Sequence, residues 1–406
     1  MKHLYSFFLA LACVGTTQAQ TALTFTARAP LPDGGRYAMG YCQDQSYFYM
    51  VGGGSPLTAF TDQVFRYDPA ANSWGSGALS TGQVPQHRLG KAVLLPADGI
   101  TPARIFVGQA TTASGPLSNM PVLNAASGQL IAAPTSGSPT ANGGMTTWNG
   151  LIYCFGGQLP NGAFTNELRS YNPATGVWTY LPGMPEAKSA QGAAINGKIY
   201  VIGGFDGAVN SNRIDTYDIA TNQWQTLAPL PTTVSNQALV VQGEWLWMIG
   251  DFTAQTYLAA YNTRTGQLRT FTSNLPGRRN AAAAIRNNQL YVWGGNTAAS
   301  NASTLADMWQ ANIGDILPTA TPNSARPQLS AYPNPSTSGE FTLDLPAGTH
   351  RVVEVRDALG RLIHTAAPAP QAERYTLPLS QQPTGVYSAR VRSDQGLSSA
   401  CQLVRQ

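Results

Sequence analysis

The sequence of 406 residues predicts an all-β protein, a six-bladed β-propeller followed by a small C-terminal β-sandwich of immunoglobulin-like type. The first reason is a unit of about 45 residues that recurs along most of the chain. Its glycine-rich stops are 56, 48, 47, 47 and 44 residues apart, at Gly52, Gly108, Gly156, Gly203, Gly250 and Gly294. This is the period of a propeller repeat.

A second set of positions repeats in phase with the glycines. In five copies an apolar or aromatic residue stands seven positions before another, at Tyr67/Trp74, Leu123/Leu130, Tyr171/Trp178, Tyr217/Trp224 and Tyr261/Leu268. Each blade must bury an apolar face against its neighbours, and residues that recur at the repeat period serve that packing. We therefore expect these pairs to lie inside the blades.

The clearest copy of the unit spans residues 187–231 and predicts four antiparallel strands. A strand at Ala193–Ile195 is followed by an Asn196-Gly197 turn and a strand at Ile199–Ile202 that Gly203-Gly204 ends. After a polar loop, a third strand ends at Tyr217 and a fourth opens at Trp224.

These glycine, tyrosine and tryptophan spacings resemble the kelch repeat over roughly residues 22–316. The third and fourth copies match best, with LIYCFGG…SYNPATGVW and KIYVIGG…TYDIATNQW. Other copies depart from the pattern, with Gly108-Gln109 in the second, and with Gly250-Asp251 and Leu268 in the fifth. The resemblance implies a propeller whose loops bind ligands or partners.

The sixth copy lacks a recognisable fourth strand. After Trp309 the chain continues as GDILPTATPN, whereas FTARAPLP at 25–32 aligns with WQTLAPLP at 224–231. We therefore expect Phe25 to start the outer strand of the last blade, because such closure removes the exposed sheet edges of an open ring. The predicted propeller spans residues 20–316.

Residues 1–19 predict a secretory signal peptide. Lys2 precedes an apolar run from Leu4 to Val14, and Thr17-Gln18-Ala19 ends in the small residue expected before cleavage. The run is too short to span a membrane as a helix of the mature protein, for which we predict no transmembrane segment. An alternative is that Cys13 accepts a lipid, although the leucine usual three positions earlier is absent.

Composition agrees with an exported β-protein and argues against nucleic-acid binding. Charged residues make up 11% of the chain, and residues 21–325 hold 15 Lys and Arg against 14 Asp and Glu. A nearly neutral propeller has no electrostatic footprint for nucleic acid. Three cysteines fall beyond the signal peptide, Cys42, Cys154 and Cys401, and we expect free thiols because an odd number at unpatterned spacing is not a disulfide framework.

Residues 317–328, rich in Pro, Thr and Ser, predict a linker, and residues 329–406 predict a second domain. Alternating stretches such as FTLDL and VVEVRD, separated by turn signals, describe a small antiparallel sandwich. In order, its motifs resemble the C-terminal sorting domain of the type IX secretion system (also called the Por secretion system). They are carried by Pro333, Asn334, Pro335, Gly339, Gly360, Gly385 and Tyr387.

This second resemblance implies a partner and a destination. The type IX machinery would recognise the C-terminal domain at the outer membrane after the chain crosses the periplasm, and the protein would become secreted or displayed on the cell surface. Gln402 stands where the family usually has Lys. The alternative for this domain is a generic surface-adhesion sandwich.

Catalytic and metal chemistry have little support in the sequence. His87 is the one histidine of the predicted propeller, whereas a kelch-type copper oxidase resembling galactose oxidase needs two histidine ligands. Calcium loops, histidine-rich zinc sites and serine nucleophile elbows are absent from the sequence. We therefore predict no cofactor, no metal and no catalytic residue.

A binding surface is predicted at one rim of the ring, on the loops before the first strand and after the second strand of each blade. Arg36, Arg88, Lys188 and Arg279 precede their glycine stops by fifteen to twenty residues and form one predicted column, which would favour an acidic ligand. The alternative is that such basic residues make structural hydrogen bonds. The candidate binding residues are Arg36, His87, Arg88, Lys188, Arg278, Arg279, Asp206 and Asn296.

The leading hypothesis is an exported binding module for an extracellular glycan or protein. One alternative is a sugar-active enzyme similar to the sialic-acid mutarotases, which would need a carboxylate or histidine with an arginine at the axial mouth. Another is a structural component of the cell surface.

Overall fold

The computed structural model describes residues 21–98, 100–314, 316, 329–345, 351–357, 361–393 and 398–406. They form two compact units, which divide near residue 317. The predicted signal peptide, Cys13 and the predicted linker lie outside the described residues. Strands make up both units, together with one 3-10 turn at Asn301–Ser303, so the all-β prediction is confirmed for the described part of the chain.

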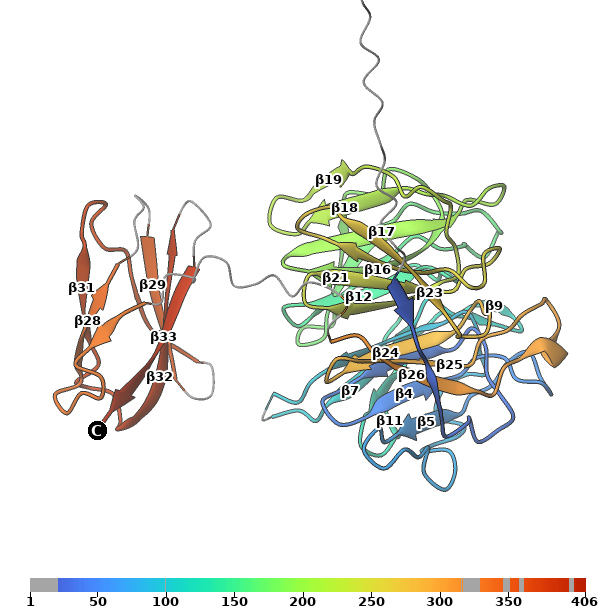
Figure 1. The fold of residues 1–406 in the computed structure, drawn as a ribbon, viewed down its shortest axis with the longest axis horizontal. Helices are drawn as coiled ribbons and strands as arrows, with labels where there is room; N and C mark the ends of the chain where they lie inside the picture. The colour runs from blue at the N-terminus through green and yellow to red at the C-terminus, as the bar shows by residue number, and fades with distance from the viewer. Residues whose placement is uncertain are drawn as a thin grey trace, which may run out of the picture. The chain divides into compact units, whose positions relative to one another are not determined.

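Six sheets of three to five strands, the blades, and one two-stranded sheet make up the first unit (Figure 1). The first blade contains β3 (Gly40–Gln43), β4 (Phe48–Val51) and β5 (Val64–Tyr67). The second contains β6 (Lys91–Leu95), β7 (Arg104–Gly108), β10 (Val122–Asn124) and β11 (Leu130–Ala132). The third contains β12 (Gly144–Trp148), β13 (Leu151–Phe155), β14 (Leu168–Asn172) and β15 (Val177–Leu181). A small hairpin, β8 (Thr111–Thr112) with β9 (Gly115–Pro116), extends from the second blade.

The remaining three blades follow the same order. The fourth blade contains β16 (Ser189–Ile195), β17 (Lys198–Phe205), β18 (Ile214–Asp218) and β19 (Gln223–Thr226). The fifth contains β20 (Ala238–Gln242), β21 (Trp245–Ile249), β22 (Leu258–Asn262) and β23 (Leu268–Ser273). The sixth contains β24 (Ala282–Arg286), β25 (Gln289–Trp293) and β26 (Met308–Asn312), joined by β2 (Thr26–Arg28). In the fourth blade, β17 continues through Gly203-Gly204 to Phe205, whereas the sequence predicted that the glycines end it.

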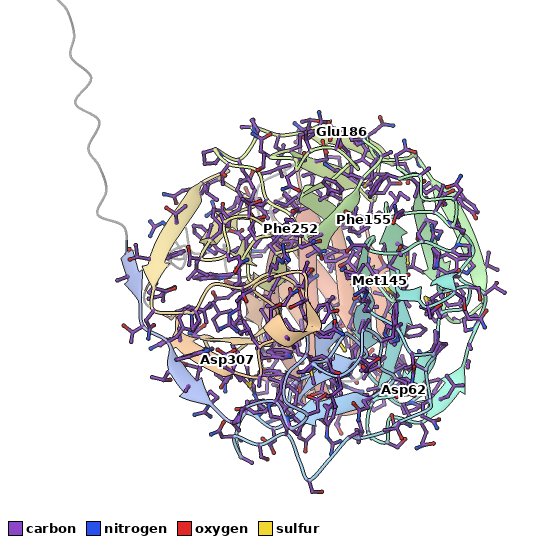
Figure 2. The ribbon with its side chains drawn as sticks, turned by 90° about the vertical axis from the view of Figure 1, so that its right-hand side faces the viewer. Asp62, Met145, Phe155, Glu186, Phe252 and Asp307 are labelled. Carbon is purple, nitrogen blue, oxygen red and sulfur yellow. The ribbon has the colours of Figure 1, made fainter. Side chains whose placement is uncertain are left out.

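The first strands of the six blades pack against one another in a closed ring. β3 contacts β6, and contacts continue through β12, β16, β20 and β24 back to β3. Figure 2 shows the blades arranged around this axis. The ring is the β-propeller that the repeat period predicted.

The amino-terminal residues contribute strands to two blades. β2 pairs antiparallel with β26, Ala27 opposite Trp309, and supplies the fourth strand of the sixth blade. Before it, β1 (Thr21–Leu23) adds a parallel fifth strand to β23, which the sequence did not predict (Figure 1). Phe25 lies between the two strands. Its N–H donates to the side-chain oxygen of Asn274 at 2.7 Å, its carbonyl accepts from the Asn274 side-chain nitrogen at 2.9 Å, and its ring is buried.

Four of the five residue pairs seven positions apart are cross-strand partners within the blades, and in the fifth the rings of Tyr67 and Trp74 are in contact. Tyr171 faces Trp178 and Tyr217 faces Trp224, with ring centroids 4.9 and 5.2 Å apart. Each tryptophan indole also donates to a carbonyl more than forty residues earlier, Trp178 to Thr135 at 2.9 Å and Trp224 to Pro182 at 2.7 Å. The pairs therefore pack the blade and tie its outer strand to the preceding segment.

The glycine pairs allow neighbouring blades to approach through their backbones. The second glycine of a pair donates its N–H to a carbonyl of the next blade, from Gly53 to His87, Gly157 to Lys188, Gly204 to Val234 and Gly295 to Arg36, at 2.8 to 2.9 Å. The first glycine has a left-handed φ, and at Gly203, Gly250 and Gly294 a Cβ would overlap the same type of carbonyl. Any side chain there would push two blades apart.

The second blade departs from this pattern by one residue. Gln109, with φ of 54°, takes the left-handed position, and Gly108 does not. Its amide is buried and bonds the Thr140 hydroxyl of the next blade. Counting from Gln109, the spacing to Gly156 becomes 47 residues, which equals the two spacings that follow. The sequence placed this stop at Gly108 because glycine usually occupies a left-handed position.

The second unit consists of two sheets that share one core. β27 (Ala331–Tyr332), β28 (Glu340–Asp344) and β31 (Arg374–Pro378) form one sheet, and β30 (Leu362–Ala366), β29 (Arg351–Arg356), β32 (Gly385–Ser393) and β33 (Ser398–Arg405) form the other. Phe341 and Leu377 of the first sheet are buried with Val353, Tyr387 and Leu403 of the second.

Candidate functional site

The loop that leads into the first strand of a blade, here called the lead-in loop, repeats one backbone conformation. A left-handed residue with φ of 53 to 55° marks its end in five blades, at Ala38, Leu89, Asn142, Asn236 and Asn280. Neighbouring blades are joined here by backbone bonds, from Asn280 to Asn236, Ala38 to Asn280 and Leu89 to Ala38, at 2.7 to 2.9 Å. The lead-in loops therefore sit in a common register that the left-handed residue defines.

The residue two positions before the left-handed one is buried. Arg36, His87 and Arg278 occupy this position, and all three have an exposed fraction of 0%. Lys188 takes the matching place in the fourth blade, is equally buried, and accepts the Gly157 N–H with its carbonyl. We call these four residues the buried column.

Each cation of the buried column is bonded inside the protein. Arg36 and Arg278 each donate to the carbonyl of the glycine sixteen residues later, Gly52 at 3.2 Å and Gly294 at 3.1 Å. Arg278 also makes a bidentate ion pair with Asp307, at 3.0 and 3.1 Å. Arg36 bonds Asp33 and the Thr61 hydroxyl. These bonds satisfy charges whose burial would otherwise be costly.

Lys188 and His87 complete the column in the same way. Lys188 lies 3.3 Å from Glu186 and 3.4 Å from the buried Asp215, which also accepts from Arg213. His87 donates through Nδ1 to the Pro85 carbonyl at 2.7 Å, and its ring covers Gly52. Burial lowers the pKa of His87, so the ring is neutral at physiological pH.

The structure thus corrects the predicted cationic column at the rim. Arg36 and Lys188 belong to the buried column, whereas Arg88 and Arg279 stand one residue later in their lead-in loops. A shift of one residue turns the side chain from the space between blades toward the loops, where Arg88 is part-exposed and Arg279 is 8% exposed. The four cations therefore do not converge on one mouth, and Arg36, His87, Lys188 and Arg278 make the structural hydrogen bonds that the alternative interpretation describes.

Two arginines of the later position stack on aromatic rings of the neighbouring loops. The Arg279 guanidinium lies 4.0 Å from the centroid of Phe252, whose side chain is 45% exposed. Arg88 lies 5.1 Å from the centroid of Phe60 and donates to the Tyr37 hydroxyl at 3.0 Å. Figure 2 shows Phe252 nearer the centre of the ring than Glu186, Asp62 and Asp307.

Other side chains of the loops after the second strands are open to solvent. Leu57 is 95% exposed and Val209 is 62% exposed. We call Phe60, Arg88, Phe252 and Arg279, together with Leu57 and Val209, the loop rim. Sequence reasoning did not single out Phe60, Leu57 or Val209, because an isolated apolar residue in a loop carries no signal of its own.

The two remaining candidates from the sequence shape their own loops. The Asp206 carboxylate accepts from the N–H groups of Ala208 and Val209, both at 2.8 Å, and these bonds lower the pKa of Asp206. Asn296 is buried, accepts from the Asn280 amide at 3.0 Å and donates to Ala298 at 2.6 Å. Asp206 is exposed on its turn, whereas Asn296 has no free amide group to offer a ligand.

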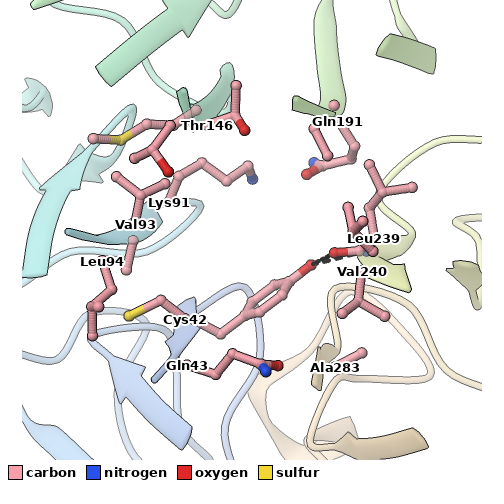
Figure 3. Close-up of a pocket in the computed structure, with 17 residues that line it drawn as sticks. Cys42, Gln43, Lys91, Val93, Leu94, Thr146, Gln191, Leu239, Val240 and Ala283 are labelled. Carbon is pink, nitrogen blue, oxygen red and sulfur yellow. Dashed lines mark hydrogen bonds between the residues drawn. The ribbon is translucent and has the colours of Figure 1, made fainter. Parts of the chain in front are cut away.

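A separate cavity of about 310 Å³ lies on the ring axis, between the first strands of the blades (Figure 3). It is lined by residues of β3, β6, β12, β16 and β20, and by Ala283 of β24. The Tyr41 hydroxyl crosses it, donating to the Leu239 carbonyl at 3.2 Å and accepting from the Leu239 N–H at 2.9 Å. The small side chains of Ala281–Ala284 leave room for this crossing.

Lys91 is the charged residue of this axial cavity. Its lining contains no Asp, Glu or His, and Lys91 makes no ion pair with any described residue. Burial without a partner lowers the pKa of Lys91 from 10.5 to about 8. Sequence reasoning missed Lys91; the only available signal was a cation at the start of the apolar strand KAVLL.

The motif residues of the C-terminal unit hold its last strand in place. The Asn334 amide donates to the Gln402 carbonyl at 2.6 Å and accepts from the Val404 N–H at 2.8 Å. Gly339 has φ of 76°, and a Cβ there would meet the Ser380 backbone. Tyr387 donates to the Pro383 carbonyl at 2.5 Å. Pro333 and Pro335 flank Asn334, Gly385 begins β32, and Gly360 lies outside the described residues.

The described residues contain no cluster of three His, Cys, Asp or Glu side chains that could hold a metal ion. Nor do they contain a helix of the length and apolar character needed to cross a membrane. Cys42, Cys154 and Cys401 are free thiols.

The buried column and the loop rim differ in their expected effect on stability. Arg278→Met should lower the free energy of unfolding of the propeller by about 3 kcal/mol, because it removes the donor to the Gly294 carbonyl and the cation that pairs with Asp307, which keeps the Trp309 indole N–H. Arg279→Met, the matched control one residue later, should cost less, about 1 kcal/mol, because Arg279, although only 8% exposed, makes no ion pair with a described residue and donates to the Phe252 carbonyl at 3.5 Å. All eight tryptophans lie within residues 74–309, so tryptophan fluorescence in urea reports on this unit alone. Equal losses of unfolding free energy in the two variants would contradict the assignment of Arg278 to the buried column and of Arg279 to the loop rim.

Lys91 should make stability depend on pH. Its folded pKa of about 8 lies below its ordinary value of 10.5, so the unfolded chain binds more protons between these two values. The free energy of unfolding should therefore rise between pH 8 and pH 10.5, by at most about 3 kcal/mol, less the effect of water in the cavity. Urea titrations of the protein and of Lys91→Met should diverge over this range; parallel curves would show that the amine is not desolvated.

Comparison with known proteins agrees with both units. Residues 38–250 match the KLHDC2/KLHL20/DRC7 Kelch-repeats domain, and residues 330–405 match the secretion system C-terminal sorting domain. Kelch-like protein terF of Aspergillus terreus (strain NIH 2624 / FGSC A1156) is 26% identical over 256 residues, 51% of this chain and 54% of that protein. Kelch-like protein 41a of Danio rerio is 38% identical over 66 residues, 16% of this chain and 11% of that protein.

The chain therefore spans about half the length of one of these relatives and about a tenth of the other. The sorting domain indicates export through type IX secretion to the cell surface or the medium. The first unit, a propeller built from a repeat that the family model matches over more than half of the chain, gives the family: this protein belongs to the kelch-repeat family and carries a type IX secretion sorting domain at its C-terminal end.

Proposed function

We propose that the protein is an exported binding module whose loop rim engages an extracellular protein. The observation that carries the proposal is the half-exposed ring of Phe252, held by the guanidinium of Arg279, which is 8% exposed and lies 4.0 Å from the ring centroid. Arginine and aromatic side chains dominate the binding energy of protein interfaces, and a stack held in place before binding loses little entropy when a partner docks.

The surroundings of this stack support a protein partner. Leu57 and Val209 hold apolar side chains in water on other loops of the same rim, where nothing in the described part of the chain covers them. Loops on a rigid scaffold are the usual carriers of binding function. The relatives with kelch repeats favour an interaction module as well.

A glycan is the second candidate, because the same stacks offer a cation beside an aromatic face. Arg88 on Phe60 and Arg279 on Phe252 could hold an acidic sugar by charge and by ring contact. A mutarotase-like activity would need a carboxylate or histidine at the axis, and the axial cavity is lined by neither. A structural role at the cell surface is the outcome if the rim binds nothing.

Delivery completes the proposal. The signal peptide predicted at residues 1–19 would take the chain into the periplasm, and the C-terminal unit would engage the type IX machinery. The propeller would then act at the surface or in the medium.

The rim proposal predicts that one pair of substitutions removes binding. Phe252→Ala with Arg279→Ala should weaken capture of the partner at least tenfold, because truncated interface residues of this type commonly cost more than about 1.4 kcal/mol. The measurement is quantitative cross-linking to surface proteins of the producing cells, together with a glycan array that includes acidic sugars.

A matched control carries the same residue types elsewhere on the propeller. Tyr180→Ala with Arg264→Ala removes an exposed aromatic ring from β15 of the third blade and an exposed arginine from the turn between β22 and β23 of the fifth. A partner retained by this control and lost by the rim variant would support the proposal, and a glycan with that behaviour would select the second candidate. A partner retained by both variants would overturn the rim as the binding surface.

A further inference from the structure

The axial cavity has the form of a small-molecule site that is separate from the loop rim. Its volume of about 310 Å³ is at the lower end of the range for such sites. Apolar side chains make most of its wall, including Val93, Leu94, Met145, Leu239 and Val240. A second, smaller cavity of about 20 Å³ lies between the left-handed residues of the lead-in loops and shares Tyr41, Lys91 and Gln191 with the axial cavity. The larger space therefore lies toward the opposite ends of the first strands.

One ammonium group points into this apolar space. In Figure 3 the Lys91 amine and the Gln191 side chain point toward one another across the cavity, and the Thr146 hydroxyl lies nearby. The other titratable side chains of the lining are Tyr41 and Cys42; burial raises both pKa values, so each is neutral at physiological pH. Lys91 is therefore the charged group of the lining and gives the cavity a single positive charge.

Lys91 is part-exposed, and a cation that loses much of its hydration without gaining a partner is costly; the lining supplies no acid for it. In the buried column, by contrast, Lys188 meets two carboxylates and Arg278 meets one. The missing partner of Lys91 can come from a ligand. A single amine fits a singly charged group better than a phosphate, for which the lining offers no second cation.

We propose that the axial cavity binds a small monocarboxylate with an aliphatic body. The carboxylate would pair with the Lys91 amine and accept from the Gln191 amide or the Thr146 hydroxyl. The aliphatic part would lie against Val93, Leu94, Leu239 and Val240.

The test is isothermal titration calorimetry of the full chain with hexanoate, acetate and hexanamide. Hexanoate should bind at least tenfold more tightly than hexanamide, which has the same body without the charge. It should also exceed acetate, by about fourfold for each methylene that becomes buried. Equal binding of hexanoate and hexanamide, tighter binding of acetate or chloride, or no binding of hexanoate at millimolar concentration would each overturn the proposal.

Variants locate the site. Lys91→Met keeps an unbranched side chain and should weaken hexanoate binding at least tenfold, whereas Lys198→Met removes a lysine that is 41% exposed on β17 and should leave it unchanged. Thermal unfolding of both variants checks that each is folded, and Lys91→Gln is a second variant for the same purpose. Binding that survives in Lys91→Met would overturn the assignment.

The proposal for the loop rim and the proposal for the axial cavity can be tested independently of one another. The Phe252→Ala with Arg279→Ala variant should bind hexanoate as the unaltered protein does. Loss of hexanoate binding in that variant would show that the ligand occupies the loop rim, and would overturn the axial site.

Discussion

The propeller depends on one backbone contact that is repeated between blades. At each glycine pair a left-handed residue brings the end of the second strand against the lead-in loop of the next blade, and the following N–H bonds a carbonyl of that loop. At Gly156, Gly203, Gly250 and Gly294 a Cβ would collide with a carbonyl of that loop. The lead-in loops are therefore placed by their neighbours, and the first strands that follow them close the ring.

This contact decides which side chains can reach a ligand. In three glycine pairs the carbonyl that accepts the N–H belongs to the buried column, and in the fourth it belongs to Val234. The side chains of the buried column lie between blades, where Arg36, Lys188 and Arg278 find acids and carbonyls. The next residue is free of that constraint, and in two blades it is an arginine that stacks on an aromatic ring. The first strands, in turn, enclose an axial cavity with one unpaired amine.

The repeat architecture could be predicted from the sequence because its signals are periodic. Tyr217 and Trp224 mark cross-strand partners, and FTARAPLP resembles a fourth strand closely enough to indicate where β2 would pair. The register of the lead-in loops could not be predicted in the same way. Their distance to the glycine varies between blades, so a window of fifteen to twenty residues admits both Arg278 and Arg279. One residue separates the ion pair with Asp307 from the stack on Phe252.

Two further features depend on several blades at once. Lys91 begins an ordinary apolar strand, and its isolation appears only when six first strands meet and none brings an acid. β1 is three residues long, and its parallel pairing with β23 rests on the burial of Leu23 and Phe25 against the fifth blade. No local pattern reports such long-range packing.

The most direct test of the contact between blades is a pair of glycine substitutions. Gly203 and Gly75 both have a left-handed φ, 64° and 76°, but a Cβ at Gly203 would overlap the Val234 carbonyl, whereas at Gly75 it would meet nothing within 4 Å. Gly75→Ala should lower the free energy of unfolding by about 1 kcal/mol, the cost of the backbone conformation alone. Gly203→Ala should cost at least about 2 kcal/mol more, because the blades must separate and an interblade hydrogen bond is lost. Equal losses, measured by tryptophan fluorescence in urea, would contradict the claim that the ring depends on this contact.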